Sequence, residues 1–262
     1  MKNKLNQLFE SKKENLLSIY FSAGFPELES TKKIISTLST SGVDFIEVGI
    51  PFSDPLADGP TIQKSSSIAL ENGMSLKLLF EQLYTIKETN TTPLIMMGYW
   101  NSVLQFGVEN FLKTCVKAKI SGAILPDLPL EIYEQKYQTL FESYNIPMVF
   151  LITSQTSEER IRKIDKFSKA FIYAVSSSST TGNKTGIEGA KSYLQRIKSY
   201  QLKNPIITGF NIKNKADYQF ACQFTQGVVI GSAFIKAIQQ KGSLEKNIVD
   251  FISEFDIKPR NL

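Results

Sequence analysis

The sequence predicts an α/β protein built as one closed (β/α)8 barrel, and three observations lead to that fold class. Eight short, strongly apolar runs alternate with segments whose apolar residues recur at the helical period. Most of the runs are apolar without interruption, as is typical of parallel strands covered on both faces. The 262 residues also have the usual length of one barrel and contain no linker-like stretch. We therefore expect a single domain spanning residues 1–262.

Eight parallel strands are expected to close on one another. Their ranges are 17–22, 45–49, 94–98, 123–125, 148–153, 171–175, 206–208 and 228–230. The alternative is an open doubly wound sheet. The number of strand candidates argues against it, and so does the lack of a G-x-G-x-x-G pattern after the first strand. The sequence therefore favours the TIM barrel architecture.

Helices are expected between the strands, with extra helices in the loops that follow them. Apolar residues at helical spacing run through 76–83 and 244–255, and a slightly wider stripe covers 133–144. An additional helix before the first strand carries three apolar residues within 5–9. We expect this N-terminal helix to cover the bottom of the barrel.

Several residues are expected to begin or end these helices. Thr156 with Glu159 has the spacing of a capping box, in which a hydroxyl and a carboxylate satisfy the first free N–H groups. Gly42, Gly73 and Gly122 follow helical segments, where a residue with left-handed backbone is favoured. We expect all three glycines to end helices.

The lack of histidine limits the chemistry that the chain can perform. It excludes Ser-His-Asp and Cys-His nucleophilic mechanisms and any histidine metal site. The two cysteines, Cys115 and Cys222, form no C-x-x-C pair, so a disulfide framework and a cysteine metal site are not expected. We therefore expect no metal site, and proton transfer must use Asp, Glu, Tyr or Lys.

Neither a membrane segment nor a nucleic-acid surface is expected. The unbroken apolar stretches fall far short of the roughly 20 residues that span a bilayer. Residues 1–17 lack the apolar core of a signal peptide and contain acidic residues. The net charge of +5 comes from lysines scattered among acidic residues, which indicates a solvated surface that can also favour a phosphate anion. We expect a cytoplasmic protein.

The second expected strand contains a carboxylate where an apolar residue is usual. Alternation puts Glu47 on the same face as Phe45 and Gly49. A carboxylate inside a barrel is costly to ionise and acquires a raised pKa, which suits a general acid or base. The alternative is a structural glutamate paired with Lys or Arg. The following loop is stiffened by prolines and carries Asp54 and Asp58, which either position chemistry or shape turns.

The loop after the sixth expected strand, residues 176–186, is small, polar and rich in glycine and serine. At this end of a barrel such a loop is either a lid over the site or a plain flexible connection. It lacks the Gly-Lys spacing of a phosphate-binding P-loop. Tyr173, at the end of the preceding strand, has a phenol that either reaches the cavity or belongs to the core.

Two turns, at 208–212 and 230–233, follow the last two expected strands. Barrels often bind phosphate there through backbone N–H groups. Gly231 permits close approach of a ligand, and the Ser232 hydroxyl can donate a hydrogen bond to it. The residues alone thus predict a barrel enzyme for a phosphorylated small molecule, with carboxylates that transfer protons.

The run FSDPLADGP at 52–60, within the longer stretch 45–63, resembles the signature of the tryptophan synthase alpha subunit. Supporting matches lie at 22–26, 99–101, 126–129, 209–210 and 231–232, so the resemblance covers nearly the whole chain. It implies a lyase of tryptophan biosynthesis. The implied reaction is the retro-aldol cleavage of indole-3-glycerol phosphate to indole and glyceraldehyde 3-phosphate.

The resemblance also implies roles for particular residues. Glu47 matches the acid–base residue that moves protons, and Asp58 matches the carboxylate that accepts the indole N–H. Tyr173 matches a tyrosine beside the glutamate, and Thr181 matches the threonine of the lid. The residues that match the phosphate site are Gly182, Phe210, Asn211, Gly231 and Ser232. The residues that match the walls of the indole pocket are Tyr20, Met97, Ile124 and Phe210.

A partner subunit is implied as well. The resemblance implies an α2β2 heterotetramer in which the beta subunit holds pyridoxal phosphate, so that no cofactor belongs to this chain. The residues that match the docking face are Asp54, Trp100, Asn101 and Asp127. A stand-alone lyase and a catalytically weak barrel that activates a partner remain as alternatives.

Three departures from the family pattern bear on these alternatives. Asn211 stands where a glycine is expected to meet the phosphate, although asparagine tolerates left-handed backbone. The lid lacks the arginine and the extra glycine found in many relatives. Trp100 stands where a small residue is common, either as part of the partner face or as part of the core.

Overall fold

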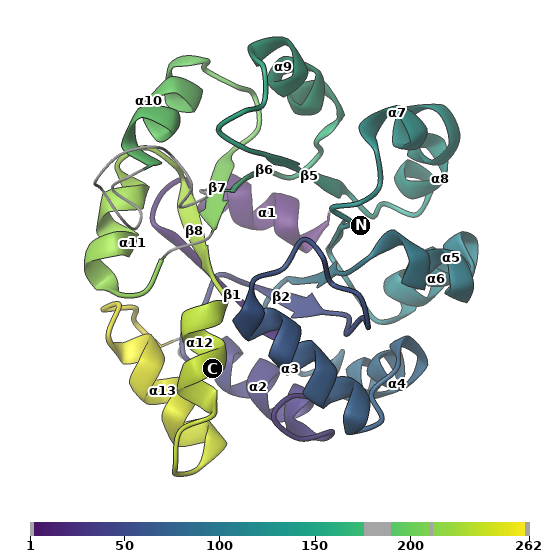
Figure 1. The fold of residues 1–262 in the computed structure, drawn as a ribbon, viewed down its shortest axis with the longest axis vertical. Helices are drawn as coiled ribbons and strands as arrows, with labels where there is room; N and C mark the ends of the chain where they lie inside the picture. Colours follow the sequence, from purple (N-terminus) through teal and green to yellow (C-terminus); the bar gives the residue numbers. More distant parts are fainter. Residues whose placement is uncertain (1–2, 176–189, 210–211, 260–262) are drawn as a thin grey trace.

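The computed structural model describes residues 3–175, 190–209 and 212–259 and contains a closed barrel of eight parallel strands (Figure 1). Each strand pairs with the next along the chain, and β8 pairs with β1. The strands are β1 Leu16–Ser22, β2 Phe45–Gly49, β3 Leu94–Met97, β4 Gly122–Ile124, β5 Met148–Ile152, β6 Ile172–Val175, β7 Ile206–Gly209 and β8 Gly227–Ile230. All eight expected strands are confirmed, with ends that agree to within one residue.

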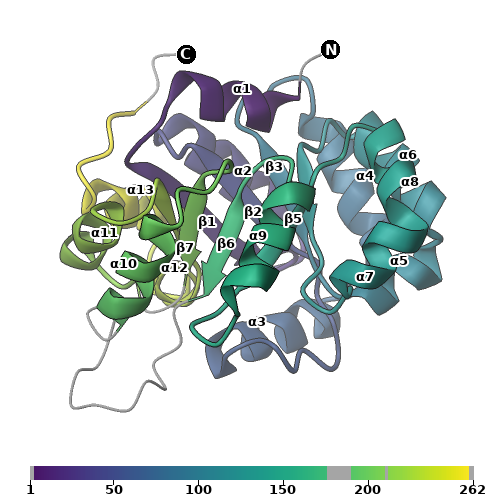
Figure 2. The same cartoon turned by 90° about the horizontal axis from the view of Figure 1, so that it is seen from above.

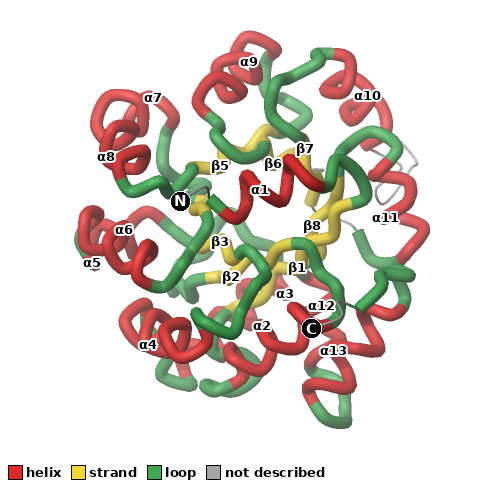
Figure 3. Tube along the Cα trace, turned by 180° about the vertical axis from the view of Figure 1, so that it is seen from behind, coloured by secondary structure: helices red, strands yellow, loops and turns green. Residues whose placement is uncertain are grey.

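Apart from α1, which lies across one end of the barrel, the helices form a ring outside the strands (Figure 3). They are α1 Lys4–Ser11, α2 Ser30–Thr40, α3 Pro60–Glu71, α4 Leu76–Ile86, α5 Trp100–Phe106, α6 Val108–Lys117, α7 Leu130–Ile132, α8 Gln138–Ser143, α9 Glu158–Phe167, α10 Lys191–Ser199, α11 Lys215–Cys222, α12 Ser232–Ile238 and α13 Leu244–Ser253. No helix of the described ranges is long and apolar enough to cross a membrane.

The N-terminal helix α1 lies across one end of the barrel, opposite to α3 (Figure 2). Its Leu5 is fully buried, and the ring of Phe9 lies 6.2 Å from that of Phe45 and 5.7 Å from that of Phe171. Because Phe45 and Phe171 stand where β2 and β6 begin, α1 closes the bottom of the barrel as expected. The functional end is therefore the opposite one.

A π-helical segment, η1 (Tyr133–Tyr137), connects α7 to α8. Hydrogen bonds in a π-helix connect residues five apart and not four, so buried side chains recur at a wider spacing than in an α-helix. Tyr133 and Phe141 are both buried, and their rings meet edge to face at 5.6 Å. The wider apolar stripe in the sequence is thus explained by this segment.

Two expectations about helix ends are wrong. Gly42 and Gly73 have left-handed φ values of 93° and 91°, as expected, but Gly122 is the first residue of β4. After α6 the left-handed residue is Lys119, with φ of 57°, because the chain reverses directly behind the helix. In α9 the cap is also one residue later than expected.

The N-cap of α9 is Ser157, whose hydroxyl accepts a hydrogen bond from the N–H of Arg160 at 3.3 Å. Thr156 instead accepts a hydrogen bond from the N–H of Thr153 at 2.9 Å. The threonine therefore shapes the turn that leads into the helix, and the serine behind it caps the helix.

Candidate active site

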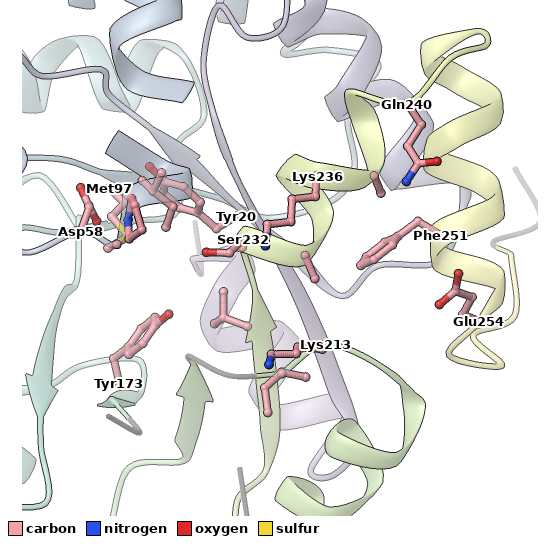
Figure 4. Close-up of a pocket in the computed structure, with 18 residues that line it drawn as sticks. Tyr20, Asp58, Met97, Tyr173, Lys213, Ser232, Lys236, Gln240, Phe251 and Glu254 are labelled. Atoms are coloured by element: carbon pink, nitrogen blue, oxygen red, sulfur yellow. The ribbon is translucent and has the colours of Figure 1, made fainter. Parts of the chain in front are cut away.

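A cavity of about 610 Å³ opens at the carboxyl ends of the strands (Figure 4). Six residues that the sequence analysis singled out come together in its lining: Tyr20, Asp58, Met97, Tyr173, Gly231 and Ser232. They come from β1, the β2–α3 loop, β3, β6 and the start of α12. Distant parts of the sequence thus meet at the end of the barrel where TIM barrels carry their active sites.

Two tyrosines lie across the interior of the barrel, and each fills the space above a glycine. A Cβ atom on Gly49 would lie 2.4 Å from the hydroxyl oxygen of Tyr20, on the neighbouring strand. A Cβ atom on Gly209 would lie 2.1 Å from the hydroxyl oxygen of Tyr173. The two glycines are therefore required for the tyrosines to take these positions. Burial raises the pKa of both phenols, so they keep their protons.

Glu47 lies inside the barrel and is completely buried. Among the described residues, neither oxygen of its carboxyl group has a hydrogen-bond partner. Burial raises the pKa of Glu47 to about 8, because an ionised carboxylate would lose its hydration there. The ion pair considered as the structural alternative is not formed with any described Lys or Arg. Glu47 is thus a neutral acid at neutral pH.

Asp58 lies at the rim of the cavity and is half-buried. The hydroxyl of Tyr99 donates a hydrogen bond to its carboxylate at 3.1 Å and accepts one from the N–H of Ala57 at 3.0 Å. Burial raises the pKa of Asp58, and the hydrogen bond from Tyr99 opposes that shift. The ring of Tyr99 stacks on Phe52 at 4.9 Å, which fixes the loop further.

Sequence reasoning missed this part played by Tyr99. The resemblance assigned the range 99–101 to the partner face, whereas the phenol turns back toward the cavity and holds Asp58. The available signal was a tyrosine that directly follows an expected strand in the sequence, at the end of the barrel that carries active sites. Hydrogen-bond partners across two loops, however, depend on the loop geometry, which the sequence pattern does not give.

The cavity lining also contains positive charge. Lys213 and Lys236, which the sequence analysis did not single out, line the cavity together with Gly231 and Ser232. Asp58 and Glu254 are the carboxylates among the lining residues. Of the other expected ligand contacts, Ile124 is fully buried at the end of β4, where it pairs with Met97. Thr181, Gly182, Phe210 and Asn211 lie outside the described residues.

The residues expected on a partner face lie on the β2–α3 loop, at the start of α5 and on the β4–α7 loop. Asp54, Asn101 and Asp127 are exposed. The carboxylate of Asp127 accepts a hydrogen bond from the backbone N–H of Trp100 at 2.8 Å. The Trp100 ring is half-buried and meets Tyr137 edge to face at 4.8 Å. One part of the ring therefore packs against the protein, and another part is exposed at the surface.

The same β2–α3 loop exposes an apolar side chain. Leu56 is 91% exposed, the highest value among the large apolar residues of the described ranges. It stands between Asp54 and Asp58 in the sequence. This loop therefore presents one apolar side chain at the surface, between two acidic residues of the sequence.

Comparisons with known proteins give one consistent result. The family model for the tryptophan synthase alpha chain matches residues 5–258. The tryptophan synthase alpha chain of Flavobacterium psychrophilum is 54% identical over 253 residues, covering 96% of this chain and 99% of that protein. The alpha chain of Christiangramia forsetii is 52% identical, with 96% and 98% covered.

Solved structures agree with the sequence relatives. Tryptophan synthase subunit alpha from Legionella pneumophila superposes with a TM-score of 0.87 at 30% identity, covering 97% of both chains. Tryptophan synthase from M. tuberculosis in its aminoacrylate-bound form gives 0.85 at 27% identity, covering 99% of this chain and 100% of that chain. Together with the closed barrel, these matches show that the chain belongs to the tryptophan synthase alpha chain family, a lyase family of tryptophan biosynthesis.

Proposed function

We propose that this chain performs the family's retro-aldol cleavage of indole-3-glycerol phosphate with Glu47 and Asp58 as its two functional carboxyl groups. The observation that carries the proposal is the contrast between them. Glu47 is buried without a hydrogen-bond partner among the described residues, whereas Asp58 lies at the rim with a phenol donating to it. Two carboxyl groups in different environments can take opposite roles in one reaction.

Glu47 supplies the protons that the reaction needs. Cleavage requires that carbon 3 of the indole gains a proton and that the neighbouring side-chain hydroxyl loses one. With a pKa of about 8, Glu47 holds a proton at neutral pH and can deliver it to carbon 3. The carboxylate that remains can then accept the hydroxyl proton, and the C–C bond breaks. Such proton transfer contributes roughly 10²–10⁴-fold to a rate.

Asp58 acts on the other side of the indole ring. Positive charge develops on the ring when carbon 3 is protonated, and a carboxylate that accepts the indole N–H stabilises that charge. The hydrogen bond from Tyr99 favours the ionised form that this role requires. Tyr173 lies on β6, across the barrel from β2, and lines the cavity. It is proposed to contact the glycerol hydroxyl groups or Glu47.

The remaining lining residues fit the rest of the substrate. The ring of Tyr20 and the side chain of Met97 supply an apolar wall for the indole, with Ile124 and Phe210 proposed beside them. The backbone at Gly231 and the hydroxyl of Ser232 suit the phosphate. Gly182, Phe210 and Asn211 are proposed to complete that site, and Thr181 to close over it. Lys213 and Lys236 add a favourable electrostatic field for an anion.

A beta-subunit partner is implied by the family, and the pyridoxal phosphate cofactor belongs to that subunit. We propose an α2β2 assembly in the cytoplasm and no cofactor in this chain. The surface formed by Asp54, Leu56, Trp100, Asn101 and Asp127 is the proposed docking face, because four of these residues match the family's docking face and an exposed leucine lies on the same loop as Asp54. Apolar centres with polar rims are typical of protein–protein interfaces.

The test is steady-state cleavage of indole-3-glycerol phosphate by the purified chain, with and without a tryptophan synthase beta subunit. Slow turnover that rises strongly with the beta subunit is expected. Fast turnover of the chain alone would favour the stand-alone lyase, and no turnover with intact binding of the beta subunit would favour an activating subunit. The variant Glu47→Gln should lose cleavage and keep substrate binding, and near-normal turnover would remove Glu47 from the mechanism.

A further inference from the structure

Glu47 is separated from the cavity in this structure. Tyr20 and Tyr173 belong to the lining of the cavity, whereas Glu47 does not. Both phenols interact electrostatically with Glu47, so they lie close to its carboxyl group. If Glu47 transfers protons as proposed above, its side chain must extend toward the carboxyl end of β2 to reach a ligand.

The path for this extension is set by the inward-facing residues of β2. The next residue on the same face is Gly49, which has no side chain to block the space above Glu47. The Tyr20 hydroxyl fills that space, since a Cβ atom on Gly49 would lie 2.4 Å from it. The Tyr173 hydroxyl is directed instead to Gly209 on β7. Tyr20 is therefore the phenol that an extending Glu47 would meet first.

Two buried serines support the Tyr20 hydroxyl in this position. Ser22, two residues further on β1, interacts with the phenol. The Ser22 hydroxyl lies 2.7 Å from that of Ser65 on α3, and the Ser65 hydroxyl donates to the carbonyl of Ile62 at 2.8 Å. Both serines are buried. A chain of buried hydroxyl groups thus connects the phenol to the helix that follows the Asp58 loop.

We propose that the Tyr20 hydroxyl is a positioning residue for Glu47, which it hydrogen-bonds when the carboxyl group extends into the cavity. A phenol can accept a hydrogen bond from a carboxylic acid and donate one to a carboxylate. Tyr20 can therefore hold Glu47 in both of the protonation states through which the proposed reaction passes. The apolar wall that the resemblance assigns to Tyr20 needs only the ring, so the hydroxyl has a separate role.

Within the described ranges, few other titratable groups face Glu47. Tyr173 faces it from β6, and Asp58 and Tyr99 interact with Tyr20 at the rim of the cavity. On β3 the residue paired with Glu47 is Ile95, which carries no charge. A change in the protonation of Glu47 within the substrate complex can therefore be attributed to the phenols.

The proposed contact between Tyr20 and Glu47 affects how kcat depends on pH. A hydrogen bond to the carboxylate favours the ionised form, so the contact with Tyr20 lowers the pKa of Glu47 in the substrate complex. In the free enzyme Glu47 has no hydrogen bond to Tyr20. Because kcat reports the substrate complex and kcat/KM reports the free enzyme, only the kcat profile should depend on the hydroxyl.

The experiment compares Tyr20→Phe with the natural chain in complex with its beta subunit, using indole-3-glycerol phosphate across the pH range. Tyr20→Phe keeps the ring, so KM should change less than about twofold, while kcat should fall about tenfold. The alkaline limb of kcat, where Glu47 loses the proton it delivers, should move up by about one pH unit. The alkaline limb of kcat/KM should not move.

Two further variants complete the design. Ser22→Ala removes the support behind the phenol and should shift the kcat profile in the same direction by a smaller amount. Tyr133→Phe, at a buried phenol outside the cavity lining, should match the natural chain. A Tyr20→Phe profile that superimposes on the natural one would overturn the inference, provided that Glu47→Gln is inactive. An active Glu47→Gln would instead overturn the proposed function itself.

Discussion

Tyr99 donates a hydrogen bond to Asp58 across 3.1 Å, and this contact joins the loop after β3 to the loop after β2. The next residue, Trp100, continues the connection, because its N–H donates to Asp127 in the loop after β4. One residue of the cavity is thus connected by successive hydrogen bonds to the surface proposed for the beta subunit. A change at that surface has a direct structural route to Asp58.

The variant Tyr99→Phe should move the acidic limb of kcat/KM to higher pH. Asp58 must be ionised to accept the indole N–H, so activity is present above its pKa and lost below it. Burial raises that pKa, and the Tyr99 hydrogen bond lowers it. Without the hydroxyl the pKa of Asp58 rises further, because the opposing hydrogen bond is lost. Activity near pH 6 should therefore fall more than activity near pH 8.

Steady-state kinetics over the pH range measure this shift. A matched control is Tyr84→Phe, which removes a phenol hydroxyl from α4, remote from the cavity lining. Equal losses of activity at all pH values would show that Tyr99 acts by holding the loop and not through the charge of Asp58.

The variant Glu47→Gln should change how stability depends on pH. Burial raises the pKa of Glu47 from 4.5 to about 8. Since the folded-state pKa is the higher one, the natural chain is favoured most below pH 4.5 and loses stability as pH rises to about 8. Within that window, each pH unit should change the free energy of unfolding by roughly 1.4 kcal/mol. Glutamine cannot ionise, so the variant should gain stability relative to the natural chain between these pH values.

Urea unfolding at pH 5 and at pH 8.5 measures the difference. The exposed Glu81 on α4 offers a control, because Glu81→Gln should shift both values equally. A Glu47→Gln variant whose relative stability is the same at both pH values would mean that Glu47 is not buried as a neutral acid in the folded chain.

The barrel itself could be predicted from the sequence because every strand is covered on both faces. An almost uninterrupted run of apolar residues then identifies each strand, and all eight ranges agree with the structure to within one residue at each end. Glu47 was identifiable for the same reason, as a carboxylate in an otherwise apolar run. The sequence pattern is informative wherever burial alone selects the residue type.

Contacts between elements were harder to predict. The requirement for Gly49 and Gly209 comes from tyrosines on neighbouring strands, and no periodic pattern reports such cross-strand contacts. Thr156 and Ser157 are adjacent hydroxyl residues, and local geometry decides which of them caps α9. Lys213 lines the cavity beside residues of β1 and α12, which lie elsewhere in the sequence. In each case the contact depends on a residue that is distant in the sequence or on the local backbone geometry.

The variant Gly209→Ala should displace Tyr173. The new Cβ would lie 2.1 Å from the phenol oxygen and 2.7 Å from the carbon that carries it, so a rigid ring must move. Overpacking of this kind costs about 1–3 kcal/mol of stability. Turnover should fall as well, because Tyr173 lines the cavity.

A double-mutant cycle with Tyr173→Leu isolates the contact. The flexible leucine leaves room for the added methyl group, so the two changes should be strongly non-additive in urea unfolding. Gly59→Ala is the control for stability, because a Cβ atom there would meet nothing within 4 Å. Additive effects of Gly209→Ala and Tyr173→Leu would mean that the glycine is not needed for the tyrosine.

The variant Ser232→Asp should raise KM for indole-3-glycerol phosphate by about tenfold or more while kcat changes little. Ser232 lines the cavity, and a carboxylate there would repel the phosphate dianion. Lys213 and Lys236 line the same cavity, so they should offset part of the repulsion. Added salt should reduce the difference in KM between the variant and the natural chain. Kinetics at low and moderate ionic strength measure both effects, with Ser243→Asp at the N-cap of α13 as control. An unchanged KM would mean that the phosphate binds elsewhere, since two anions a few ångströms apart in a partly enclosed cavity cannot be without effect on each other.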